Sequence, residues 1–134
     1  MLSNNKYLIS FCCWLVVITT LSLVSFPDDD SSSMIKIPYF DKVVHFFFYF
    51  TASVLGCLFG REQTLGRIKR SKVIWITVTG LIIYGILIEV IQSNYTTYRS
   101  GEAMDVVANS IGAIIGSFFI KMLFSKKSQL KWKI

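Results

Sequence analysis

Four long apolar blocks constrain what this chain can fold into more than any other feature. The blocks run over residues 7–26, 41–59, 73–91 and 103–124. Each is close to the roughly 20 residues that an α-helix needs to cross the hydrocarbon core of a bilayer. Helices also satisfy their backbone hydrogen bonds within the segment, as membrane-spanning structure must. The sequence therefore predicts an all-α fold, a bundle of four transmembrane helices that forms a single membrane domain over residues 1–134.

The composition agrees with a membrane protein and leaves no length for a separate soluble domain. Of the 134 residues, 53% are hydrophobic and 16% are charged, and the mean hydropathy is +0.55. A soluble domain of this size could not hide so much apolar surface, so the lipid bilayer is the first expected partner. The three cysteines lie inside apolar blocks and have neither metal-ligand spacing nor that of a disulfide framework. Lys6 precedes the block 7–26 as in a signal peptide, but the block's length and the lack of a small-residue cleavage site indicate a transmembrane helix.

The positive charges indicate how the chain is oriented. The net charge is +6, and the cations gather in short polar segments rather than along an amphipathic face, so we expect no nucleic-acid partner. Five lysines and arginines lie in segment 60–72 and four follow Phe124, against two in 27–42 and one in 92–102. Cytoplasmic segments of membrane proteins carry this excess. We therefore expect a multi-pass protein of the cell membrane with both termini in the cytoplasm.

Polar residues recur at the outward-facing end of three of the four blocks. With a rise of 1.5 Å per residue, His45 lies about 6 Å deeper than Asp41. By the same measure Asn109 lies about 6 Å deeper than Asp105, and Glu89 lies about 3–5 Å below the outer end of its helix. Ionisable side chains inside a membrane normally face the bundle interior or a water-filled cavity. The sequence therefore predicts that these five residues converge in one polar cluster in the outer leaflet.

The chemistry of the cluster allows several roles. The candidate catalytic or metal-ligating residues are Asp41, His45, Glu89 and Asp105. The candidate binding residues are Lys42, Tyr49, Gln92, Arg99 and Asn109. The carboxylates and the imidazole suit a divalent metal that activates water, and Glu89 or His45 could instead act as a general base. Structural explanations stay open, because Asp41 and Asp105 could cap their helices and His45 could be a hydrogen-bonded packing residue.

Stripes of small residues indicate how the helices pack. One stripe comprises Ala52, Gly56 and Gly60, and the other comprises Ala108, Gly112 and Gly116. Small residues at this spacing let transmembrane helices approach closely. We therefore expect blocks 41–59, 73–91 and 103–124 to pack around the polar cluster, with block 7–26 peripheral because it holds no charge.

Three ordered blocks of this sequence resemble the VanZ-like family of small membrane proteins. They read DKVVHFFFYF at 41–50, GILIEVIQ at 85–92 and YRSGEAMDVVANSIGAIIG at 98–116. The matching positions are Asp41, Lys42, His45, Phe46, Tyr49, Glu89, Gln92, Arg99, Asp105, Asn109, Gly112 and Gly116. The sequence departs from the family where Thr97 and Tyr98 precede Arg99, since a proline and a glycine are common there. The resemblance implies a polytopic protein of the bacterial inner membrane, and the family's namesake is associated with resistance to the glycopeptide antibiotic teicoplanin.

Three functional hypotheses follow. The first is an envelope protein that binds or alters a lipid-linked or anionic molecule at the outer leaflet, with Arg99, Lys42 and His45 contacting the head group. The second is a metal-dependent or acid–base membrane enzyme, although no established motif such as H-E-x-x-H is present. The third is a structural polar network, or a subunit that needs a partner. A homo-oligomer is also compatible, because four thin helices enclose little volume.

Overall fold

The computed structural model describes residues 5–24, 39–95 and 102–133, and their regular structure is entirely helical. The helices are α1 (Lys6–Leu23), α2 (Phe40–Thr64), α3 (Arg70–Tyr95) and α4 (Ala103–Leu123). All four are long and apolar enough to cross a membrane. The predicted all-α fold with four transmembrane helices is therefore confirmed.

The helix ends differ from the predicted apolar blocks. α2 continues past Phe59 to Thr64, and α3 runs from Arg70 to Tyr95 rather than over 73–91. These added turns carry polar and charged side chains. A prediction from hydropathy leaves such residues out of the apolar block, although a helix can continue through them outside the bilayer core. α1 ends earlier than predicted, at Leu23, with extended backbone at Val24. The apolar blocks thus marked the apolar part of each helix and not the full length of the helix.

α2 and α4 form the most extensive helix pair in the bundle. A Cβ atom at Gly116 would lie 2.5 Å from the carbonyl oxygen of Phe50, and one at Gly112 would collide with that of Phe46. The small-residue stripe of α4 therefore lets the two backbones touch. The stripe of α2 instead faces α3, because a Cβ at Gly60 would lie 2.5 Å from Val73 Cγ1.

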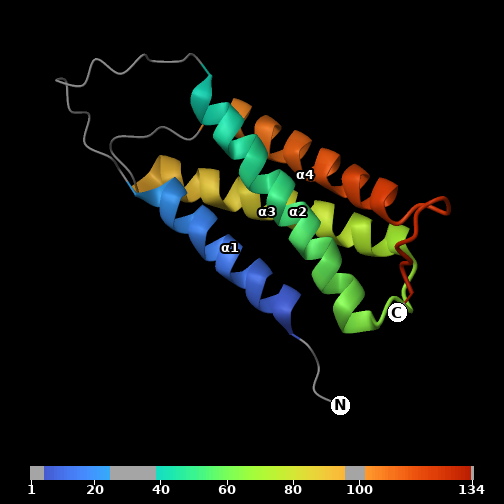
Figure 1. The fold of residues 1–134 in the computed structure, drawn as a ribbon. Coiled ribbons are helices and arrows are strands. Elements are labelled where there is room, and N and C mark those ends of the chain that lie inside the picture. The colour runs from blue at the N-terminus through green and yellow to red at the C-terminus, as the bar shows by residue number, and fades with distance from the viewer. Residues whose placement is uncertain (1–4, 25–38, 96–101, 134) are drawn as a thin grey trace.

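α1 lies on the outside of the bundle against α2 and α3 (Figure 1). Several polar contacts hold it there. Among them, Trp14 Nε1 donates to the carbonyl oxygen of Phe48 at 2.9 Å, and the Thr19 and Tyr84 hydroxyls hydrogen-bond. Ile18 is its only apolar side chain in the buried core of the described residues. This position agrees with the absence of charge from the predicted helix.

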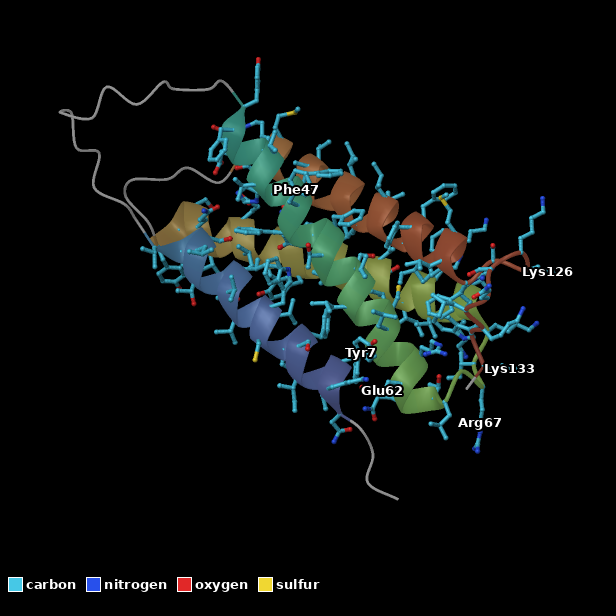
Figure 2. All side chains as sticks on the ribbon, viewed as in Figure 1. Tyr7, Phe47, Glu62, Arg67, Lys126 and Lys133 are labelled. Atoms are coloured by element: carbon cyan, nitrogen blue, oxygen red, sulfur yellow. The ribbon has the colours of Figure 1, made fainter. Side chains whose placement is uncertain are left out.

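The two ends of the bundle differ in chemistry. The starts of α2 and α4 meet the end of α3 at one end, which we call the cluster end (Figure 1). The starts of α1 and α3, the end of α2 and the tail 124–133 lie at the opposite, basic end. Figure 2 shows Arg67, Lys126 and Lys133 at the basic end, with Phe47 toward the other. The two ends are therefore separate chemical environments.

Candidate functional site: a polar cluster at one end of the bundle

His45 is the centre of the polar cluster. Its side chain projects from α2 into the bundle and is only 3% exposed. His45 Nδ1 lies 3.0 Å from the side-chain oxygen of Asn109 on α4. An amide oxygen can only accept, so Nδ1 donates this hydrogen bond and a neutral His45 keeps its lone pair on Nε2.

Carboxylates from three helices surround the imidazole. Asp41 Oδ2, one turn earlier on α2, lies 3.8 Å from His45 Nε2. Glu89 Oε1 on α3 lies 3.9 Å from His45 Nδ1. Asp105 on α4 completes a group with Asp41 and His45 in which one potential ligand atom from each residue lies within 4.8 Å of the others. The structure thus brings together the five residues that the sequence placed at one depth.

Lys42 links the first turns of α2 and α4. Its ammonium donates to Glu102 Oε2 at 2.7 Å and lies 3.3 Å from Asp105 Oδ1. The hydrogen bond to Lys42 and its charge lower the pKa of Glu102, which lies just before the membrane-spanning part of α4. Lys42 is therefore engaged by two acids and is not free to neutralise the rest of the cluster.

Glu89 and Asn109 have unused hydrogen-bonding capacity. Glu89 is 5% exposed, and neither of its carboxylate oxygens makes a hydrogen bond of ordinary geometry among the described residues, although the backbone of Glu102 lies near enough to interact with the carboxylate. The side-chain nitrogen of Asn109 makes no hydrogen bond there either, although the residue is 1% exposed. Buried polar groups left without partners cost free energy, typically about 1–3 kcal/mol each. An ordered water, an ion or a bound ligand can supply the partners that such groups need.

A groove of about 190 Å³ leads from the surface to Glu89 between α3 and α4. Its polar lining comes from Glu89, Ser93 and Glu102, and its apolar lining from Ile86, Val90, Ala103 and Val106. Val90, Ser93 and Glu102 are exposed on the side of the bundle. The groove therefore approaches the Glu89 side chain from between α3 and α4, while its carboxylate oxygens are themselves buried.

The remaining candidate binding residues have different surroundings. Tyr49 is buried one turn from His45, with its ring 6.3 Å from that of Tyr84. Gln92 Nε2 donates to the carbonyl oxygen of Ser22 at 2.5 Å and so ties α3 to α1. Arg99 lies outside the described residues. Tyr49 and Gln92 thus support the packing around the cluster, while a role in binding stays a prediction.

Two residues of the site were not predicted. Glu102 was overlooked, although it lies three positions before Asp105 and so within one helical turn of it. Gly85 was not singled out from the sequence either. A Cβ at Gly85 would lie 3.2 Å from Asn109 Nδ2 and 3.3 Å from Tyr49 Cε1. Its missing side chain makes room for the amide of Asn109, and its position four residues before Glu89 on the same face could have indicated this.

The fold and the cluster define a class of protein. Four membrane-crossing helices that enclose a histidine, carboxylates and an amide at one end are those of a polytopic integral membrane protein. The family model described as VanZ/LLP1 matches residues 5–124, so the chain belongs to the VanZ/LLP1 family. This match confirms the family resemblance over nearly the whole chain. Comparison with curated proteins and with solved structures gave no match.

Proposed function

We propose that the polar cluster binds the polar head group of a lipid-linked component of the cell envelope in the outer leaflet of the membrane. The observation that carries this proposal is Glu89, a buried carboxylate whose two oxygens make no hydrogen bond of ordinary geometry among the described residues. It also lines a groove that opens on the side of the bundle. A ligand with its lipid part in the bilayer and its head group in the groove would complete those hydrogen bonds.

The charges of the cluster indicate which head groups fit. Four carboxylates face one lysine and one histidine, and the lysine is already bonded to Glu102 and close to Asp105. Lys42 is therefore less available to contact an anionic head group directly. The carboxylates of the cluster are the groups that we expect to contact the head group. Glu89 and Asp41 suit hydroxyl or ammonium donors, such as those of a sugar or amino-sugar head group. A phosphate would bind more readily through a cation held by the same acids.

The outward orientation is part of this proposal. The cluster end carries fewer lysines and arginines in its connecting segments than the basic end, and basic segments favour the cytoplasm. Labelling tests this in a variant without the native cysteines, with Asn94→Cys at the cluster end and Lys127→Cys in the tail. A membrane-impermeant thiol reagent should label the first in intact cells and the second only after permeabilisation. The opposite pattern would move the site to the cytoplasmic leaflet and refute the outer-leaflet assignment.

The binding proposal is tested with the protein in lipid nanodiscs and a short-chain polyprenyl pyrophosphoryl amino sugar as the probe. Glu89→Gln removes the charge but keeps the size of the side chain. Because hydrogen bonds to a charged group contribute about 1.5–3 kcal/mol, affinity should fall by about 10–100-fold. The matched control is Glu62→Gln at the basic end, whose side chain accepts a hydrogen bond from the Tyr7 backbone at 3.1 Å. The control should bind the probe like the wild type.

Two outcomes would contradict the proposal. Equal affinity of the wild type and Glu89→Gln would show that the buried carboxylate does not contact the head group. Equal loss in Glu89→Gln and Glu62→Gln would show a general effect of charge.

A role in teicoplanin resistance is a further part of this proposal, and it requires that expression of the wild type, but not of correctly inserted Glu89→Gln, lowers the teicoplanin susceptibility of a bacterial host.

A metal-dependent enzyme is the second candidate, and one observation favours it. Asp41, His45 and Asp105 each offer a ligand atom within 4.8 Å of the other two, so small side-chain movements would bring them to common metal–ligand distances of about 2.0–2.2 Å. The hydrogen bond from His45 Nδ1 to Asn109 leaves Nε2 as the ligand atom. Histidines that bind a metal through one ring nitrogen commonly donate a hydrogen bond from the other in this way. Such a metal would activate water or polarise a phosphate.

Lys42 provides a test of this second candidate. Its ammonium lies 3.3 Å from Asp105 Oδ1 and competes with a cation for that carboxylate. Lys42→Met should therefore tighten binding of Zn²⁺ or Mn²⁺, while His45→Gln should weaken it by about 10-fold or more. Calorimetry on the purified protein measures both. No binding of either ion at neutral pH, or an unchanged affinity in His45→Gln, would remove the metal centre from consideration.

A further inference from the structure

A second groove, of about 590 Å³, lies at the basic end of the bundle. It is independent of the polar cluster and of the function proposed for that cluster. The lining residues that matter here are Lys69, Arg70, Trp75, Lys121, Trp132 and Lys133. They come from the start of α3, the last turn of α4 and the tail, so three separate parts of the chain build the groove.

The tail wall of this groove is held in place by hydrogen bonds. Arg61, near the end of α2, donates to the carbonyl oxygens of Lys131 at 2.7 Å and Trp132 at 2.8 Å. Trp132 Nε1 donates to the carbonyl oxygen of Ile68 at 2.8 Å. Gly66 lies against this stretch of tail, since a Cβ there would come 2.6 Å from the Lys133 Cα. The tail is thus folded back onto the segment between α2 and α3 and closes one side of the groove.

The charge of the groove is of one sign. Four of its lining residues are cations, and no acid lines it in the described part of the chain. Glu62, the acid nearest along the chain to this region, accepts a hydrogen bond from the Tyr7 backbone and so turns toward α1 (Figure 2). Like charges held around one concave surface focus a positive potential and attract an anion.

The aromatic residues indicate that the anion belongs to a lipid. Trp75, in the second turn of α3, is 72% exposed, and Trp132 of the tail also lines the groove. Tryptophan favours the level of the lipid head groups, where one side of the ring is apolar and the other is wet. Basic pockets between transmembrane helices suit anionic lipid head groups. A free anion would use the cations of this groove but would have no need of an exposed tryptophan beside them.

We propose that this groove binds the phosphate of an anionic phospholipid in the leaflet at the basic end, with the acyl chains lying beside Trp75. Lys69, Lys121 and Lys133 contact the head group from three sides. Arg70 also donates to the carbonyl oxygen of Phe124 and so connects the groove to the end of α4. The bound lipid would add contacts among α3, α4 and the tail and would offset the repulsion between their lysines.

Native mass spectrometry of the purified protein with added phosphatidylglycerol or phosphatidylcholine tests the proposal. The test variant is Lys69→Gln/Lys121→Gln/Lys133→Gln, which leaves Arg61 and Arg70 to hold the tail. The matched control, Lys126→Gln/Lys127→Gln/Lys131→Gln, removes the same charge from side chains that do not line the groove. A cation near an anionic lipid surface contributes about fivefold, so the groove variant should bind phosphatidylglycerol roughly 100-fold more weakly.

The control variant should lose less than about threefold in affinity, and phosphatidylcholine should bind weakly to all three proteins. Equal losses in the two triple variants would assign the effect to net charge and overturn the proposal. Equal binding of the two lipids by the wild type would also overturn it. Inorganic phosphate that displaces phosphatidylglycerol at comparable concentration would assign the groove to a free anion instead of a lipid.

Discussion

The hydrogen bond between His45 and Asn109 gives the sharpest test of the cluster as a physical unit. The two side chains are 3% and 1% exposed, and 3.0 Å separates Nδ1 from the amide oxygen. Asn109→Leu keeps the approximate volume of the side chain but leaves the His45 N–H buried without this partner. A buried polar group that loses its partner costs about 1–3 kcal/mol in soluble proteins. Hydrogen bonds between transmembrane helices contribute less, about 0.6 kcal/mol on average and up to about 1.7.

A double-mutant cycle isolates this contribution. His45→Phe alone leaves the Asn109 oxygen without its donor, while His45→Phe combined with Asn109→Leu removes both partners. We therefore expect the double variant to be about 1 kcal/mol more stable than the sum of the single effects predicts. Unfolding of the protein in mixed detergent micelles with increasing dodecyl sulfate, followed by circular dichroism, measures each free energy.

Asn94→Leu serves as the control, because Asn94 is exposed at the end of α3. Paired with His45→Phe, it should give additive changes within about 0.3–0.5 kcal/mol. If the changes in unfolding free energy of His45→Phe and Asn109→Leu also add within that limit, the prediction is refuted. Such a result would show that the two side chains do not share a hydrogen bond in the membrane-embedded protein.

The other predictions concern the two ends and the α2–α4 contact. Gly112→Val should destabilise the protein by about 1–3 kcal/mol in the same unfolding assay because α2 backbone lies against the glycine, whereas Gly80→Val, with nothing within 4 Å of its Cβ, should cost less. Lys42 lowers the pKa of Glu102. The ion pair therefore stabilises the folded protein fully above the pKa that Glu102 has in the unfolded chain, and this stabilisation is lost as the pH falls through the pKa of the folded protein. Lys42→Met should raise that pKa toward its ordinary value, which a carbon NMR titration detects; an unchanged titration would contradict the pair. Gly66→Ala, at φ +66°, should cost about 1–2 kcal/mol and release the tail, seen as faster proteolytic cleavage after Lys131.

The fold was largely predictable because the bilayer simplifies the problem. An apolar block of about 20 residues has few alternatives to a transmembrane helix, and the four helices follow from that. The glycine stripe of α4 likewise predicted close packing. Helix ends were harder, because Arg61, Glu62 and Gln63 extend α2 by helical propensity in a region where hydropathy has no signal.

The site was predictable in membership more than in detail. The rise per residue along each helix predicts that His45, Glu89 and Asn109 lie at the same depth in the membrane. Ionisable side chains at that depth face the bundle interior, so the sequence also predicts that they lie close together. Depth does not specify rotation or partner, so the sequence could not show that Lys42 would pair with Glu102. The groove beside Glu89 depends on how α3 and α4 pack against each other, which is a property of the whole bundle.

The folded-back tail has a consequence for the order in which the protein is completed. Arg61 and its partner Trp132 are 71 positions apart. At about 5–20 residues per second, the ribosome needs roughly 4–14 s to synthesise that interval. During this time Arg61 must be satisfied by water or by lipid head groups, although α2 and α3 can already be inserted. The basic end therefore closes only after the tail leaves the ribosome, and any delay in synthesis beyond α3 leaves its arginines open to competing partners.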